Sequence, residues 1–277
     1  MRPQRRVVLV VEYDGTGFAG FQSQRGRPGG RVTVQDALRA AVQRATGESP
    51  RLLAAGRTDA GVHALGQVVA FDTTSSIPGD RFAPALNRHL PDGVVVRRSW
   101  EAEASFHPQY GAVSKEYRYL LLTRKEPTAL ARHRAWWVPR ELDLEAMREA
   151  AAGLTGRHDF AAFASTGSSA RSTVRTVYRL DLLPQPPWLV VAVEGDGFLY
   201  RMVRRLVAGL VEVGRGRMAP ADLTRRLKEP HLKPPVGTAP PWGLYLVRVR
   251  YPPEQPGGVE GPGDPIGELI DPLASMW

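Results

Sequence analysis

The order in which strand-like and helix-like segments follow one another constrains the fold of this chain most. Within residues 1–105, β-branched apolar runs predict strands and apolar residues at 3.6-residue spacing predict helices. Their order is strand–helix–strand–strand–helix–strand, and the rest of the chain repeats it without sequence similarity between the halves. The predicted segments are residues 6–13, 33–47, 52–56, 67–73, 80–90 and 93–100, then 116–123, 144–154, 174–183, 188–194, 199–213 and 243–251.

This repeated order predicts an α+β protein with two ferredoxin-like (βαββαβ) domains, each with helices covering one face of its sheet. We expect the domains to span residues 1–105 and 106–251. Residues 252–277 are rich in proline, glycine and acidic residues, which is typical of a tail. The uncovered sheet face of such a domain is the surface that RNA-recognition sheets use for binding.

The charge of the chain predicts a polyanionic partner. The formal net charge is +9, and because the last five acidic residues all follow Arg250, residues 1–250 carry +14. Only four of the 37 basic residues are lysines. Arginine suits phosphate recognition, although a GC-rich genome or a heat-adapted host would produce the same preference.

Residue types that are missing or scattered restrict the chemistry. The chain has no cysteine, which excludes thiol nucleophiles and thiolate zinc sites, and its six histidines form no close ligand pair. We therefore expect neither a metal nor another cofactor. The apolar run of residues 7–11 is too short for a signal peptide, and no segment is long enough to span a membrane, so we expect a cytoplasmic protein.

The octet Gly-Arg-Thr-Asp-Ala-Gly-Val-His at residues 56–63 is the strongest local candidate for a site. It directly follows an apolar strand-like run, and its glycines allow a sharp turn and a close approach by another group. Asp59 could be a carboxylate displayed for chemistry. Equally, Asp59 and Arg57 could form a surface salt bridge in a polar turn.

The sequence Gly-Thr-Gly-Phe-Ala-Gly at residues 15–20 matches the GxGxxG pattern of dinucleotide-binding proteins. That function requires a helix to open at the third glycine, and residues 21–30 cannot form an amphipathic helix. The lack of a helix after the third glycine therefore argues against a nucleotide cofactor. The same loop could still contact RNA through its aromatic, amide and arginine side chains.

Two further side chains have both a structural and a functional interpretation. On the predicted helix 199–213, Arg204 lies at the shoulder of the apolar stripe, where it could extend along the surface or reach a carboxylate such as Asp59. Tyr117 alternates with Tyr119 and Leu121 on one strand face. Core packing is the usual outcome of that pattern, but an aromatic ring on an open face could stack on a base.

Several unconnected motifs, in order along the chain, resemble those of the bacterial tRNA pseudouridine synthase A family. The resemblance extends from about Val8 to Pro252. The motifs are YDGT at 13–16 with Phe18 and GFQ at 20–22, TVQ at 33–35, GRTDAGVHA at 56–64, KEYRY at 115–119, HDF at 158–160, Phe198 with MVR at 202–204, and APP at 239–241 with GLYL at 243–246.

This resemblance implies an isomerase that converts uridine to pseudouridine at positions 38, 39 and 40 of the tRNA anticodon stem-loop, without metal or cofactor. It implies a homodimer whose subunits have the pseudouridine-synthase fold, with a shared antiparallel sheet and a basic central cleft. It also implies Asp59 as the catalytic carboxylate, Arg204 as its partner, Tyr117 as the base-stacking residue and Arg57 as the residue that helps extrude the base. The alternative is a non-catalytic RNA-binding or chaperone module of the same fold.

Overall fold

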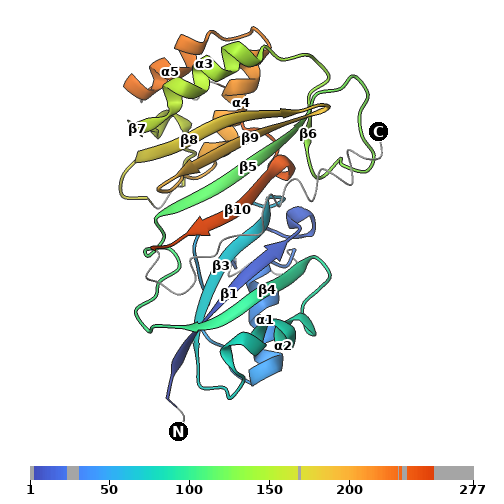
Figure 1. The fold of residues 1–277 in the computed structure, drawn as a ribbon, viewed down its shortest axis with the longest axis vertical. Coiled ribbons are helices and arrows are strands. Elements are labelled where there is room, and N and C mark those ends of the chain that lie inside the picture. The colour runs from blue at the N-terminus through green and yellow to red at the C-terminus, as the bar shows by residue number, and fades with distance from the viewer. Residues whose placement is uncertain (1–2, 24–30, 168–169, 230, 233–235, 253–277) are drawn as a thin grey trace. The chain divides into compact units, whose positions relative to one another are not determined.

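The computed structural model describes residues 3–23, 31–167, 170–229, 231–232 and 236–252 (Figure 1). The chain divides into two compact units: unit 1 comprises residues up to Val113 and from Leu246 onward, and unit 2 comprises Ser114–Tyr245. The sequence-based division at residues 105 and 106 stays a prediction. Except for Pro252, the predicted tail lies outside the described residues.

Unit 1 is a sheet whose strands follow the order β4-β1-β3-β10, with β2 paired to β3. Strand β1 pairs antiparallel with both β3 and β4. Helices α1 and α2 pack against each other, and α2 packs against β4 (Figure 1). The bounds are β1 (Arg5–Tyr13), α1 (Val34–Thr46), β2 (Leu53–Ala54), β3 (His63–Thr73), α2 (Phe82–Asn87), β4 (Val94–Ala102) and β10 (Leu244–Arg250), with 3₁₀ turns at Gly15–Gly17 and Gly79–Arg81.

Helix α1 shows why this local sequence folds as predicted. Thr33 caps the helix by accepting a hydrogen bond from the Asp36 backbone N–H at 3.2 Å. Gly47 ends it in a left-handed conformation, with φ of 76°. Val34 and Leu38 are fully buried on the apolar stripe between these ends. The prediction of a helix between Thr33 and Gly47 is therefore confirmed.

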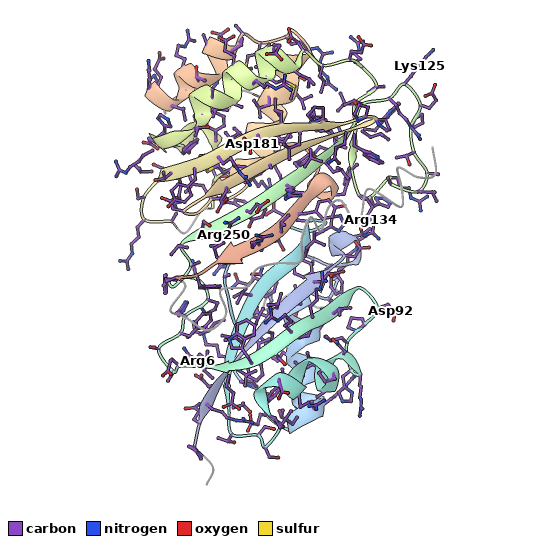
Figure 2. The ribbon with its side chains drawn as sticks, in the orientation of Figure 1. Arg6, Asp92, Lys125, Arg134, Asp181 and Arg250 are labelled. Atoms are coloured by element: carbon purple, nitrogen blue, oxygen red, sulfur yellow. The ribbon has the colours of Figure 1, made fainter. Side chains whose placement is uncertain are left out.

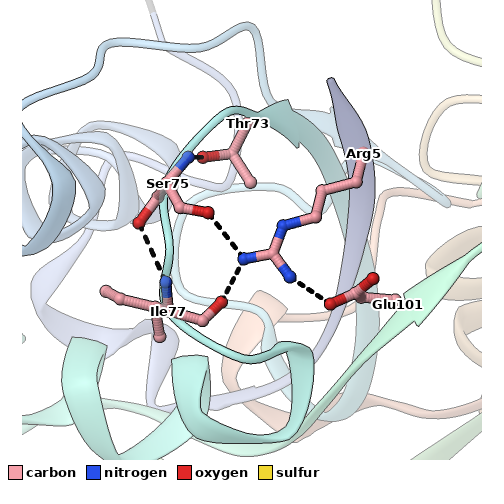
Figure 3. A network of polar contacts seen from close by, with 5 residues as sticks. All are labelled: Arg5, Thr73, Ser75, Ile77 and Glu101. Atoms are coloured by element: carbon pink, nitrogen blue, oxygen red, sulfur yellow. Dashed lines mark hydrogen bonds and ion pairs between the residues drawn. The ribbon is translucent and has the colours of Figure 1, made fainter. Parts of the chain in front are cut away.

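Arg5, at the start of β1, ties together the segment that follows β3 (Figure 3). Its guanidinium donates to the Ser75 carbonyl at 2.7 Å and to the Ile77 carbonyl, and it also pairs with Glu101 on β4. Within the same segment, the Ser75 backbone N–H donates to Thr73 Oγ1 at 3.0 Å. One side chain thus donates hydrogen bonds to two carbonyls of an irregular segment, where strand pairing does not supply the donors.

The neighbouring Arg6, labelled in Figure 2, anchors the chain after β4. It holds Asp72 with two parallel bonds, from Nε at 2.7 Å and from Nη2 at 2.8 Å. Its Nη1 donates to the Phe106 carbonyl at 2.6 Å. The segment that leaves β4 is thereby fixed to strands β1 and β3 of unit 1.

Unit 2 contains the strand order β5-β9-β8-β7, with β6 paired to β5. Helices α3, α4 and α5 pack against one another, and α3 packs against β8 (Figure 1). The bounds are β5 (Ser114–Leu122), β6 (Trp136–Trp137), α3 (Leu144–Leu154), β7 (Gly156–Asp159), β8 (Val174–Gln185), β9 (Trp188–Gly195), α4 (Met202–Gly214) and α5 (Pro220–Lys228), with 3₁₀ turns at Ala161–Phe163 and Pro241–Gly243.

The α+β class is confirmed, but some sequence-based details need correction. β6 pairs parallel with β5, so the strands are not all antiparallel. The short elements β6, β7 and α5 were not expected from the sequence. Helix α4 starts at Met202 instead of residue 199 because Arg201 adopts a left-handed conformation, with φ of 62°. Among the residues described, no helix is long and apolar enough to cross a membrane.

Candidate active site

The octet at residues 56–63 forms the connection between strands β2 and β3. The Ala55 N–H donates to the Val68 carbonyl at 2.8 Å, which extends the strand pairing to the start of the octet. The Val62 N–H then donates to the Asp59 carbonyl at 3.1 Å and closes a tight turn. Asp59, the first residue of this turn, is partly buried, and Arg57, two residues earlier, is exposed. The octet thus displays both side chains on a hairpin held by backbone bonds.

Two buried polar side chains, Tyr13 and Gln67, form a frame that holds this hairpin in place. The Tyr13 hydroxyl lies 2.7 Å from Thr58 Oγ1, and the Phe21 N–H donates to the Thr58 carbonyl at 3.1 Å. Gln67 Nε2 donates to the Gly56 carbonyl at 2.8 Å. Burial raises the pKa of Tyr13 to about 12, against the smaller opposing effect of its hydrogen bonds, so the hydroxyl stays protonated at neutral pH. The residue just before Asp59 is therefore held from both its side chain and its backbone.

The GxGxxG loop packs directly against the octet. Gly20 has φ of +93°, and a Cβ placed on it would lie 2.8 Å from the Thr58 carbonyl oxygen. A Cβ on Gly15 would lie 2.0 Å from the Val62 carbonyl oxygen. Only glycine permits backbones to approach this closely. The glycine pattern therefore serves the packing of two loops, and no nucleotide is needed to account for it.

His63, the last residue of the octet, is a buried part of this packing. It is the first residue of β3, and only 2% of it is exposed. Its Nδ1 accepts a hydrogen bond from the Gly15 N–H at 3.1 Å and lies 3.1 Å from Asp14 Oδ1. Nδ1 is thus within hydrogen-bond distance of two groups of the loop that precedes Gly20. We therefore assign His63 to holding the loop.

Arg204, on helix α4 of unit 2, is buried, with 9% of its surface exposed. Its Nε donates to the Ala239 carbonyl at 2.7 Å, and its own carbonyl accepts from the Ala239 N–H at 3.2 Å. These two bonds fix both the backbone and the plane of the guanidinium. The interpretation of Arg204 as a side chain extended along the surface is wrong. An arginine this buried requires charge or hydrogen-bond compensation.

Tyr117 lies on the same face of β5 as Tyr119, because side chains alternate along a strand. The residue is 8% exposed, and its ring meets Phe198 edge-on, with ring centroids 5.3 Å apart. Tyr119 is fully buried and donates to the Pro240 carbonyl at 2.7 Å. Burial raises the pKa of Tyr119 well above its usual value, and the charge of Arg204 opposes this rise. Arg204 is thus close to the strand face that carries Tyr117.

The candidate residues fall into two pairs. Arg57 and Asp59 belong to unit 1, and Tyr117 and Arg204 belong to unit 2. The convergence of all four on one uracil-sized site stays a prediction. Sequence reasoning proposed the four residues but did not anticipate Phe198 as the edge contact of Tyr117. Within the described ranges, no three His, Cys, Asp or Glu side chains are grouped so that they could hold a metal ion.

Comparison with known proteins identifies the family. The family model described as tRNA pseudouridine synthase matches residues 9–111 and 150–252. A tRNA pseudouridine synthase A from Acetivibrio thermocellus is 46% identical over 247 residues, which cover 89% of this chain and 100% of the relative. The chain belongs to the tRNA pseudouridine synthase family. Its relatives named tRNA pseudouridine synthase A from Syntrophomonas wolfei and Geobacter sulfurreducens are both 44% identical, with 89% of this chain and 98% and 100% of theirs covered.

The segments matched by the tRNA pseudouridine synthase model contain three of the four candidate residues. Arg57 and Asp59 fall in the first segment and Arg204 in the second. Tyr117 lies between the two segments, at residues that the family model does not match. The frame around the octet, formed by Tyr13 and Gln67, also lies within the first segment. Membership of this family makes the chain an isomerase.

Proposed function

We propose that this protein converts uridine to pseudouridine in tRNA, at positions 38, 39 and 40 of the anticodon stem-loop, with Asp59 as the catalytic carboxylate. In this reaction the bond between uracil N1 and the ribose C1′ breaks, the base rotates, and a bond forms between C5 and C1′. The proton lost from C5 balances the proton gained at N1. The reaction therefore needs no co-reactant, and no cofactor is part of the proposal.

The base must leave the stem before the reaction can begin, because its reacting atoms are inaccessible inside a duplex. Extruding a nucleotide costs a few kcal/mol. Contacts between phosphates and a protein with a balance of +14 over residues 1–250 would offset this cost. Arg57, exposed on the octet, is suited to enter the stem and help extrude the base. Tyr117 would then stack on the uracil.

Asp59 acts only if its carboxylate is ionised in a partly dry site. A nearby guanidinium favours the charged form of a carboxylate. In the proposed enzyme, Arg204 supplies this charge, and its bonds to Ala239 prevent the guanidinium from rotating away. Attack on C6 of the base, attack on C1′, and abstraction of a sugar proton are three chemically consistent roles for the carboxylate.

The observation that carries this proposal is the fixation of the residue before Asp59. Thr58 is bound through its side chain by Tyr13 and through its carbonyl by Phe21, in a buried environment. A polar turn that served only as a surface connection would not require a buried frame. A catalytic carboxylate does, because small displacements of a reacting group lower the rate strongly.

The remaining parts of the proposal concern assembly. Each subunit would consist of two ferredoxin-like domains that share a sheet and form a basic cleft for RNA. The enzyme would act as a homodimer in the cytoplasm. Sedimentation of the full chain, alone and with tRNA, tests the stoichiometry of this assembly.

The decisive experiment incubates the full chain with a tRNA transcript, without cofactor, and maps pseudouridine by sequence position. We expect product at positions 38, 39 and 40 with the wild-type chain and none with Asp59→Asn. The affinity of Asp59→Asn for tRNA should stay within about tenfold, because phosphate contacts set affinity. Asp92→Asn is the matched control, since Asp92 is an exposed carboxylate of the same unit (Figure 2).

The outcomes separate the enzyme from its rival. Product formed by Asp59→Asn would remove Asp59 from the mechanism. Tight tRNA binding by the wild-type chain, with no pseudouridine at any position, would favour the non-catalytic RNA-binding module. Product at tRNA positions other than 38–40 would keep the activity and overturn the proposed specificity.

A further inference from the structure

Lys115 stands two residues before Tyr117 on β5, so both side chains lie on the same face of the strand. The strand pairing places Lys115 opposite Gly195, the last residue of β9, and Tyr117 opposite Val193. Gly195 has no side chain, and the place where its Cβ would stand is closed by the Thr176 carbonyl oxygen, 2.6 Å away. A Cβ on Gly195 would lie 3.3 Å from Cζ of Phe198, the residue that contacts Tyr117. Lys115 therefore lies next to the Tyr117–Phe198 pair.

A second cation lies beside Lys115. Arg175, near the start of β8, packs against the turn after β9, where a Cβ on Gly197 would lie 3.6 Å from its Nε. Its Nη1 donates to the carbonyls of Ser172 at 2.9 Å and of Val174 at 2.6 Å. These bonds fix the side chain of Arg175 but do not neutralise its charge. Gly195 pairs with Lys115 on β5 and with Val177 on β8, and Arg175 stands two residues before Val177, so the two cations lie on the same face of the sheet. They are close enough for the charge of Arg175 to act on the Lys115 amine.

The neighbouring carboxylates form hydrogen bonds or ion pairs with groups other than Lys115. Glu116 and Glu194 pair across β5 and β9, and alternation places both on the opposite face from Lys115. Arg118 Nε lies 3.0 Å from Glu116 Oε1, and the Ser114 hydroxyl donates to Glu194 Oε1 at 2.6 Å. On the turn itself, Asp196 is exposed and accepts from the Thr176 N–H at 3.0 Å. Over the described part of the chain, the Lys115 amine has no hydrogen-bond or ion-pair partner.

The geometry points to a phosphate-binding subsite formed by Lys115 and Arg175, which takes the phosphodiester next to the uridine that stacks on Tyr117. This inference rests on the proposed function, because Tyr117 defines the position of the base. A partly buried ammonium group without a counter-ion costs free energy, and an anionic ligand supplies the missing charge. The RNA backbone provides one such charge at every nucleotide.

The ionisation of Lys115 agrees with this assignment. Burial, and to a smaller degree the charge of Arg175, lowers the pKa of Lys115 to about 8. A phosphate bound between the two cations would favour the protonated lysine and reverse this effect. In the free protein, Lys115 therefore lacks a negative charge that an anionic ligand would provide.

The test uses the full chain and a chemically synthesised anticodon stem-loop with one target uridine. In one RNA, a neutral methylphosphonate replaces the phosphodiester on the 5′ side of that uridine, and in another it replaces the one on the 3′ side. Single-turnover rates are measured for the wild type, Lys115→Met and Lys115→Arg. Lys228→Met is the control, because Lys228 is exposed on α5 and its substitution removes the same charge.

We expect Lys115→Met to lower the rate about tenfold or more, the effect of one charged hydrogen bond, while Lys115→Arg and Lys228→Met keep most of it. One of the two methylphosphonates should lower the wild-type rate similarly. On that RNA, Lys115→Met should cause no further loss, because the two changes remove the same contact. The salt dependence of stem-loop binding by Lys115→Met should fall by about one phosphate contact.

Two results would overturn the subsite. The first is a wild-type rate that is insensitive to both methylphosphonates, which is measured on the unaltered protein and needs no variant to fold. The second is a loss from Lys115→Met that is equally large on all three RNAs, because it would show that the lysine acts elsewhere. If the wild-type chain forms no pseudouridine on the unmodified stem-loop, the proposed function itself has failed, and the subsite falls with it.

Discussion

The hydroxyl of Tyr13 lies 2.7 Å from Thr58 Oγ1, and this contact joins strand β1 to the residue that precedes Asp59. Only 3% of Tyr13 and 8% of Thr58 are exposed. The contact is therefore shielded from water. In such a buried place a hydrogen bond is stronger than in water, and its loss leaves an unsatisfied polar group. It connects the core of unit 1 directly to the candidate catalytic loop.

Tyr13→Phe should weaken both stability and catalysis. Removing the hydroxyl leaves Thr58 Oγ1 without this partner, which costs about 1–3 kcal/mol of unfolding free energy. Because the loop then moves more freely, the single-turnover rate should fall roughly tenfold to hundredfold. Chemical denaturation and rate measurements check the two effects. Tyr178→Phe, at an exposed tyrosine of unit 2, should change neither, and an unchanged rate in Tyr13→Phe would contradict the role of the frame.

Gly20→Ala should destabilise unit 1 through a backbone clash. The added Cβ would lie 2.8 Å from the Thr58 carbonyl oxygen, and the residue would keep a φ of +93° that alanine adopts only with strain. We expect a loss of about 1–3 kcal/mol, measured by chemical denaturation. Gly17→Ala is the matched control in the same loop, because a Cβ at Gly17 would meet nothing within 4 Å. Equal stability of the two variants would show that the loop adjusts freely.

Arg204→Ala should lower the rate of catalysis far more than the affinity for tRNA. The guanidinium is buried and held by Ala239, so it is not placed to bind an exposed phosphate. We expect the affinity to stay within about tenfold, since numerous phosphate contacts share it. Arg217→Ala removes the same charge from an exposed position just after α4 and serves as the control. Weaker tRNA binding together with a normal turnover rate would refute the pairing of Arg204 with the catalytic carboxylate.

Sequence patterns predicted the elements whose formation is decided locally. Helix α1 has a capping threonine, a terminal glycine and a continuous apolar stripe between them. By contrast, β7 (Gly156–Asp159) contains no apolar side chain and exists because it pairs with β8. Helix α5 has only Leu223 and Leu227 as buried residues, which is too few for a periodic signal. Such elements depend on partners that are distant in the sequence.

The candidate site likewise has residues that the sequence could select and contacts that it could not. Residue type and family resemblance were sufficient to select Asp59 and Arg204. The frame beneath Asp59 was not predictable, because Tyr13 and Thr58 are separated by 45 residues. The role of the GxGxxG glycines was not predictable for the same reason: the group that approaches Gly20 is the Thr58 carbonyl, and no ligand phosphate is needed to explain the glycine.

Lys115→Met should make the free protein more stable near neutral pH, although it lowers the proposed activity. In the folded protein the pKa of Lys115 is lowered from 10.5 to about 8, so the folded state disfavours the charged amine. Below pH 8 the lysine is protonated in both the folded and the unfolded chain, and the cost of burying its charge is present in full. Between pH 8 and 10.5 the unfolded chain binds more protons, so the stability of the wild type rises with pH.

The stability gain of Lys115→Met over the wild type should therefore be largest below pH 8 and shrink as the pH approaches 10.5. Thermal unfolding of both proteins at about pH 7 and about pH 10 measures this difference. Lys228→Met should show no such pH dependence, because that side chain is exposed. A Lys115→Met protein that is less stable than the wild type at neutral pH would mean that the amine already has a stabilising partner in the free protein. That result would remove the main reason for an anion to bind beside Lys115. A functional buried charge instead predicts that Lys115→Met gains stability and loses rate.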